Sequence, residues 1–87
     1  MRLDQLLPTL GIIKRRTVVK ELADNGLIEI NGQRAKPSRA IAAGDTISVR
    51  GSKPLTVKIL ALPTGSVRKE RREEYYQTLA ADSAGHN

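Results

Sequence analysis

The stretch KRRTVVKELADNGLIEING, residues 14–32, decides the fold, because its apolar period changes halfway along. Over residues 14–24 the apolar side chains recur at helical spacing, and the charged side chains lie off that stripe. Asn25-Gly26 ends the helix, since glycine readily takes the left-handed conformation after a last turn. Ile28 to Ile30 then alternate with polar residues as a strand does. The stretch therefore predicts a helix over 14–24 followed by a strand.

The segments downstream of this strand continue with strand period. Asn31-Gly32 is a strong hairpin signal, because both central residues of a tight hairpin turn need a positive φ, and residues 33–35 return along the hairpin. Residues 46–50 and 55–59 also alternate, with Ile47, Val49, Leu55, Val57 and Ile59 directed inward. These segments predict a small antiparallel sheet.

The two ends of the chain complete the prediction. Leu3, Leu6 and Leu7 predict a short helix over residues 2–7, which Pro8 ends. We expect an α+β fold, in which two helices pack on a small antiparallel sheet and a helical or extended tail follows. Residues 1–60 form the domain, 61–79 a linker and a C-terminal helix over 67–79, and 80–87 a disordered tail.

The charge of the chain points to an anionic partner. Its 87 residues carry 15 Lys and Arg against 9 Asp and Glu, a net charge of +6. Nucleic acid is the commonest partner for such an excess, and a basic surface that serves only solubility is the alternative. The excess lies in the first half of the chain, as a binding face there requires. Two tyrosines are the only aromatic residues, so phosphate contact is favoured over base stacking.

Other function classes find little support. The chain has no Cys, its one His lies in the tail, and neither clustered metal ligands nor a phosphate-binding glycine loop is present. We expect no catalytic residue, no metal and no cofactor, and thus not an enzyme. No apolar run approaches the ~20 residues that span a bilayer, which together with the early Asp4 predicts a cytoplasmic protein without a membrane partner. A pure protein-interaction module is a third class, in which residues 67–79 dock a partner, but the charge pattern opposes it.

Two small groups of charged residues are candidate binding residues. Arg16 and Lys20 are four apart on one helix face, where like charges repel unless a polyanion neutralises them. Lys14 and Arg15 lie near the helix start, where the helix dipole disfavours cations, and a cluster placed against local preference is expected at a binding site. A solvated face, with Asp24 pairing Lys20, remains the alternative. Arg2 and Asp4 either both belong to the site or form a local ion pair.

Residues 2–49 resemble the S-four RNA-binding domain, named after a protein of the small ribosomal subunit. Four pieces in order carry the resemblance: Arg2-Leu3-Asp4 with Leu6 or Leu7, Lys14-Arg15-Arg16 with Leu22, Gly26-Leu27-Ile28 with Ile30-Asn31-Gly32, and Lys36-Pro37-Ser38 with Gly44-Asp45, Ile47 and Val49. The resemblance implies two helices on a small sheet that bind structured RNA across the helix pair and the adjoining loop. It also implies that Arg2 lies near RNA and that Asp4 holds the helices. The full set of expected RNA-binding residues is Arg2, Lys14, Arg15, Arg16, Lys20, Gln33, Lys36, Ser38 and Arg39.

Within this family, the chain resembles free-standing members that act in bacterial ribosome-associated quality control. Residues 12–17, IIKRRT, and a charged tail with a tyrosine carry this closer likeness. It implies a monomer that binds large-subunit rRNA and peptidyl-tRNA on obstructed subunits and supports C-terminal tailing of stalled chains, with the alanine-tailing factor as a further partner. The alternatives are a heat-shock S-four protein, another rRNA-binding assembly or translation factor, and a piece of a larger RNA-modifying or tRNA-charging enzyme. The neutral charge of residues 68–87 favours the quality-control member over the heat-shock protein, and the start at Met1 argues against a piece of a larger enzyme.

Overall fold

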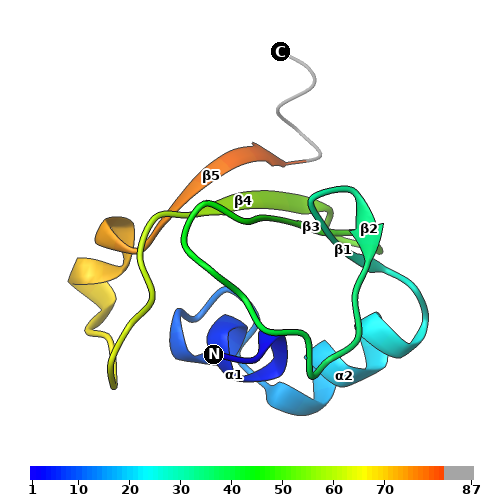
Figure 1. The fold of residues 1–87 in the computed structure, drawn as a ribbon, viewed down its shortest axis with the longest axis horizontal. Helices are drawn as coiled ribbons and strands as arrows, with labels where there is room; N and C mark the ends of the chain where they lie inside the picture. The colour runs from blue at the N-terminus through cyan, green and yellow to red at the C-terminus, as the bar shows by residue number, and fades with distance from the viewer. Residues whose placement is uncertain (82–87) are drawn as a thin grey trace.

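The computed structural model describes residues 1–81 and confirms the α+β arrangement. Two short helices pack against one face of a five-stranded antiparallel sheet (Figure 1). The strand order is β2-β1-β3-β4-β5. The elements are α1 (Leu3–Thr9), α2 (Arg16–Asp24), β1 (Ile28–Ile30), β2 (Gln33–Arg34), β3 (Thr46–Val49), β4 (Leu55–Ile59), the 3-10 helix η1 (Lys69–Glu74) and β5 (Tyr76–Ala81).

The core lies between the helix pair and the sheet. Helix α1 and the residue after it contribute four leucines that are completely buried, and α2 contributes Val19 and Ala23. The inward strand residues expected from the alternation are buried at Ile47, Val49, Val57 and Ile59, whereas Leu55 is only half-buried. Apolar burial of this kind is the main force that holds such a small domain together. The remaining fully or nearly fully buried apolar residues include Leu3, Leu6, Leu7, Leu10, Ile28, Ile30 and Ile41.

Both helices differ from their predicted bounds. Pro8 does not end α1 but lies inside it, in the last turn. A proline there costs one backbone hydrogen bond and disfavours helical geometry at Leu7, but burial of the leucines on the same helix outweighs this local preference. Helix α2 begins at Arg16 rather than at Lys14, because Arg15 has an extended backbone. Lys14 and Arg15 therefore lie in the connection between the helices.

The predicted helix over residues 67–79 is wrong. Only Lys69–Glu74 are helical, as a 3-10 helix, and Tyr76–Ala81 form β5, which pairs antiparallel with β4. Without β5, β4 would be an edge strand with a row of unpaired backbone groups, and Tyr and Thr suit a strand. The sheet thus extends beyond residue 60, and Ala80 and Ala81 belong to it rather than to a disordered tail. Residues 82–87 lie outside the described residues.

The hairpin between β1 and β2 has the predicted turn, with φ +53° at Asn31 and +86° at Gly32. The Asn31 amide group donates to the Asp45 carboxylate over 3.1 Å, and its carbonyl oxygen accepts from the backbone N–H of Thr46 over 3.0 Å. The Asp45 carboxylate also accepts from the N–H of Ala42 over 2.9 Å. The Ala42 N–H, then the Asn31 amide, hold the pKa of Asp45 below its ordinary value. These bonds tie the hairpin to the turn before β3.

Candidate RNA-binding surface

The loop of residues 36–39 holds the N-terminus of α1. The N–H of Leu3 donates to the carbonyl of Arg39 over 2.8 Å, and the N–H of Asp4 donates to that of Pro37 over 3.0 Å. Ile41 in turn donates its N–H to the carbonyl of Met1 over 2.8 Å. The first N–H groups of a helix have no partner within the helix, so this loop takes the place of a side-chain cap. As a result, Arg2 lies beside a basic loop more than thirty residues away in the chain.

Asp4 lies beneath the surface and pairs with two of the expected arginines. Its side chain is completely buried, and each carboxylate oxygen accepts from a different arginine. Arg2 Nη2 lies 3.1 Å from Oδ2, and Arg16 Nη2 lies 3.2 Å from Oδ1. A buried carboxylate is tolerated only when it is paired, which makes both arginines part of the fold as well as of the surface. The pair Arg2–Asp4 was one of the two alternatives expected from the sequence; the pair Arg16–Asp4 was not foreseen.

The two arginines remain available to a ligand. The side chain of Arg2 is 50% exposed and that of Arg16 is 51% exposed. A guanidinium group carries five N–H donors in a planar fork, and each arginine contacts Asp4 through one nitrogen in this arrangement. The remaining donors can meet phosphate oxygens. Asp4 thus fixes two cationic groups side by side in a set orientation.

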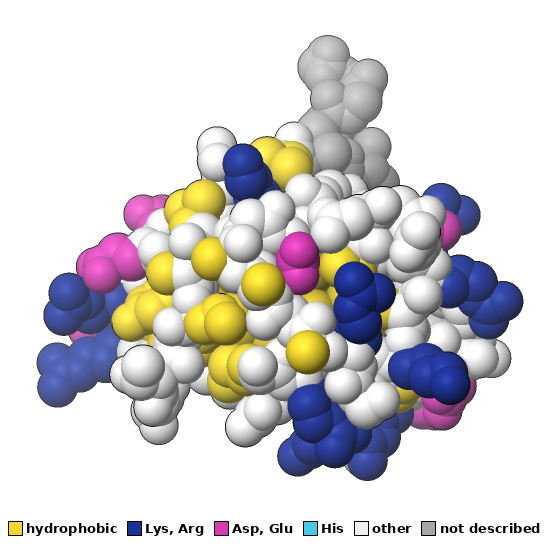
Figure 2. Space-filling model, in the orientation of Figure 1, with side chains coloured by type: hydrophobic (Ala, Val, Ile, Leu, Met, Phe, Trp, Pro, Cys, Tyr) yellow, Lys and Arg dark blue, Asp and Glu magenta, His cyan; other side chains and the backbone are white. Residues whose placement is uncertain are grey.

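The other expected residues are exposed at the surface. Lys20 follows Arg16 by one turn on the exposed side of α2, and Lys14 and Arg15 precede the helix, all exposed. Figure 2 shows Lys and Arg side chains gathered along the lower edge, where Figure 1 places α2 and the loop before it. Among residues 1–81 Lys20 and Asp24 form no ion pair. Gln33 on β2 and Lys36, Ser38 and Arg39 in the loop are exposed as well. We refer to Arg2, Lys14, Arg15, Arg16, Lys20, Lys36 and Arg39 as the basic face.

One further arginine, Arg34, is not among the binding residues expected from the sequence. Arg34 is exposed on β2, and its guanidinium lies against Gly26, the residue that ends α2. A Cβ on Gly26 would lie only 2.6 Å from Arg34 Nη2. The hairpin brings the two residues together, so spacing along a helix could not reveal the contact. Arg34 adds a cation at the carbonyl end of α2, where the helix dipole favours one.

Three of the arginines outside the basic face have other contacts. Arg50 forms an ion pair with Glu29 over 3.0 Å, and Arg71 with Glu74 over 3.1 Å. The guanidinium of Arg72 lies on Gly11, in the connection between the helices, and would have to move to admit a Cβ at this position. Within residues 1–81 there is no group of three side chains that could hold a metal ion. Among the helices of that range, none is long and apolar enough to cross a membrane.

The sequence of the chain is similar to those of known proteins. Residues 1–47 match the model of the S4 domain family, which is the S-four RNA-binding domain. The RQC P-site tRNA stabilizing factor of Bacillus subtilis (strain 168) is 42% identical over 86 residues, covering 98% of this chain and 99% of that protein. Heat shock protein 15 of Escherichia coli (strain K12) is 33% identical over 63 residues, covering 71% of this chain but 47% of that protein.

A solved structure supports the fold independently. The trimeric structure of Vibrio cholerae heat shock protein 15 has a TM-score of 0.80 at 28% identity, covering 92% of this chain and 82% of that one. The arrangement of helices and sheet is therefore shared with a heat-shock S-four protein. The match to the S4 domain spans more than half of the chain, and the Bacillus relative aligns with nearly all of it. The chain belongs to the S4 domain family, in the group of the RQC P-site tRNA stabilizing factors.

Proposed function

We propose that the protein binds large-subunit rRNA and P-site tRNA on obstructed large ribosomal subunits through the basic face. The observation that carries the proposal is the buried carboxylate of Asp4, which holds the half-exposed guanidinium groups of Arg2 and Arg16 in place. Phosphate groups on neighbouring RNA elements match such a fixed pair of forks. The Bacillus relative, which is aligned over nearly its whole length, is named for stabilising tRNA in the P site.

The protein acts by binding rather than by chemistry in this proposal. Contacts made to only one tRNA position favour that position by their differential free energy. A difference of about 1.4 kcal/mol changes the occupancy ratio tenfold, which one or two charge-assisted contacts can supply. With tRNA held in the P site, the alanine-tailing factor extends the stalled chain, and the protein supports that step as a monomer in the cytoplasm.

Rescue of free large subunits after heat shock is the second candidate, favoured by the structural likeness to heat shock protein 15. The sequence identities argue against it. This chain is 42% identical to the Bacillus factor but only 33% identical to the Escherichia coli heat shock protein. The two candidates use the same basic face, so only their cellular partners distinguish them.

The experiment measures C-terminal tails on stalled chains in cells that lack the protein. Tails should disappear, return with the wild-type chain, and fail to return with Arg16→Glu, because a contact to phosphate becomes a repulsion. That substitution should weaken binding to large subunits by more than ~1 kcal/mol. Lys58→Glu is the matched control: it makes the same charge change on an exposed position of β4 and should restore tailing. Persistent tailing together with heat sensitivity would favour the second candidate.

A further inference from the structure

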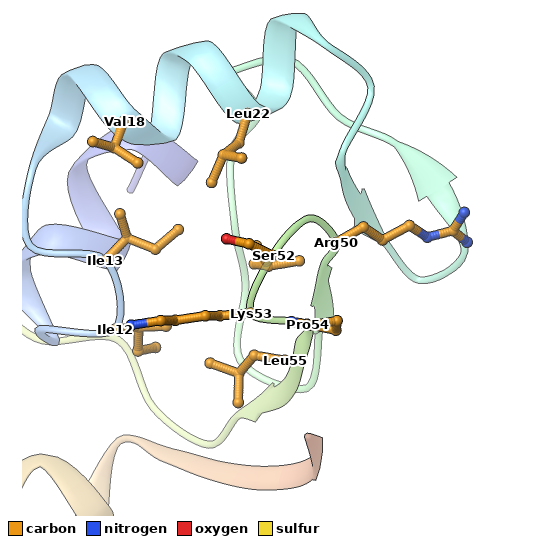
Figure 3. Close-up of a pocket in the computed structure, with 10 residues that line it drawn as sticks. Ile12, Ile13, Val18, Leu22, Arg50, Ser52, Lys53, Pro54 and Leu55 are labelled. Carbon is orange, nitrogen blue, oxygen red and sulfur yellow. The ribbon is translucent and has the colours of Figure 1, made fainter. Parts of the chain in front are cut away.

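An apolar groove lies on the other side of α2 from the basic face. Its walls come from the connection between the helices (Ile12, Ile13), from α2 (Val18, Leu22) and from the start of β4 (Leu55), and its volume is about 580 Å³. Figure 3 shows these side chains directed toward one another across the groove, with Lys53 extended along it from the β3–β4 connection. Val18 is 37% exposed, and the other four apolar side chains named here are each only partly buried.

Helix α2 separates the groove from the basic face. Successive residues of a helix are ~100° apart around its axis, so Val18 and Leu22 point about 160° away from Arg16 and Lys20. The buried side chain of Val19 lies between the two directions and holds α2 on the core. A ligand in the groove would therefore leave the basic face free, and RNA on the basic face would leave the groove free.

The charge around the groove selects its occupant. Lys53 is exposed and has no ion pair among residues 1–81, and no acidic residue lines the groove. Arg50 is turned away from the groove in Figure 3 and pairs with Glu29. The groove thus combines an apolar floor with an unpaired cation at its edge.

We infer that this groove binds an acidic amphipathic segment of a partner protein. Apolar side chains at helical spacing would fill the floor, as amphipathic helices do in apolar grooves, and a carboxylate would pair with Lys53. RNA fits less well, because phosphate would lose its hydration against an apolar floor and no aromatic side chain lines the groove for stacking. A second copy of the chain, with its net charge of +6, would meet electrostatic repulsion. The protein would then connect RNA on one side of α2 to a protein on the other.

Two synthetic helical peptides test the inference with the full chain. Both carry leucines at positions i, i+3, i+4 and i+7; the acidic peptide has glutamates at its exposed positions and the basic peptide has lysines. The acidic peptide should bind, and nuclear magnetic resonance shifts should map to Ile13, Val18 and Leu55. It should bind at least ~10-fold more tightly than the basic peptide, since one carboxylate–ammonium contact is gained and repulsion is avoided.

Exchange of charge provides the matched variant. Lys53→Glu, at an exposed position, should weaken binding of the acidic peptide ~10-fold and strengthen binding of the basic peptide. The affinity of this variant for large ribosomal subunits should stay at the wild-type level. Val18→Asp should weaken binding of the acidic peptide more than Lys53→Glu does. The inference is overturned if the acidic peptide does not bind, if both peptides bind equally, or if the shifts map to Arg16 and Lys20. It is also overturned if Lys53→Glu weakens subunit binding, which would assign the groove to RNA, or if Val18→Asp abolishes a self-association of the wild-type chain, which would assign it to a second copy.

Discussion

Replacing Asp4 by asparagine separates two accounts of how the basic face would bind RNA. If only the sum of charges matters, the loss of a negative charge should strengthen binding to a polyanion. If the orientation of Arg2 and Arg16 matters, Asp4→Asn should weaken binding, because an amide has one acceptor oxygen where the carboxylate uses two. The two accounts therefore predict opposite signs.

The structure gives the magnitude. Arg2 and Arg16 would both lose the contact that holds them, and each long side chain immobilised on binding costs about 0.5–1.5 kcal/mol. Two such side chains give about 1–3 kcal/mol, or roughly 5- to 150-fold weaker binding. The variant should lose less stability than a protein loses when a fully buried ion pair is broken, because both arginines are half-exposed and can move into water. We expect a loss of about 1–3 kcal/mol in the free energy of unfolding, which a domain of this size should survive.

Two measurements check this prediction. Filter binding to purified large subunits that carry P-site tRNA, at one fixed salt concentration, gives the affinity of Asp4→Asn and of the wild-type chain. Urea unfolding gives the stability of both chains and shows whether the variant is folded under the binding conditions. Unchanged or tighter binding by a folded variant would refute the idea that Asp4 acts by orienting the arginines.

Three further predictions concern positions outside this cluster. The pKa of Asp45 is held below its ordinary value of 3.8, so the stabilisation by this group is complete above pH 3.8 and is lost as the pH falls through the lower pKa of the folded state; Asp45→Ala should flatten the acid limb of unfolding measured by circular dichroism. Gly26→Ala and Gly32→Ala should each lower stability in urea by a similar amount, since both glycines have positive φ and the guanidinium that a Cβ on Gly26 would meet belongs to the exposed, flexible Arg34 side chain, which can move aside. Ending the chain after Leu79 should leave affinity for large subunits unchanged while lowering the melting temperature slightly, because two residue pairs between β4 and β5 are lost.

Local patterns predicted the central part of the fold. The change of period at Gly26 placed α2 and β1, and Asn31-Gly32 placed the hairpin, because both signals depend only on neighbouring residues. The C-terminal segment failed for the opposite reason. Tyr76 pairs with Ile59, and such a pairing depends on a partner far along the chain, which no local spacing displays.

The candidate surface was also predictable only where its signals are local in the sequence. The residue types and positions of Arg16 and Lys20 were visible as a basic helix face in the sequence. The contact of Arg16 with Asp4, twelve residues earlier, was not, although an acidic residue among the core leucines of α1 is a signal for a buried partner. The contact of Arg34 with Gly26 had no local signal, because the turn at the end of β1 creates it.

The sheet has a consequence for how this module can be moved between proteins. The matched S4 domain ends at residue 47, inside β3, yet Val57 and Ile59 on β4 are almost completely buried in the same core as α1. The segment recognisable by descent is thus shorter than the segment that folds. A graft of residues 1–47 into another protein would carry the residues of the basic face but expose the apolar side chains that β4 covers. A recombinant that keeps a folded domain must therefore include the later strands or supply substitutes for them. The end of the family match and the end of the folded unit lie at different residues of this chain.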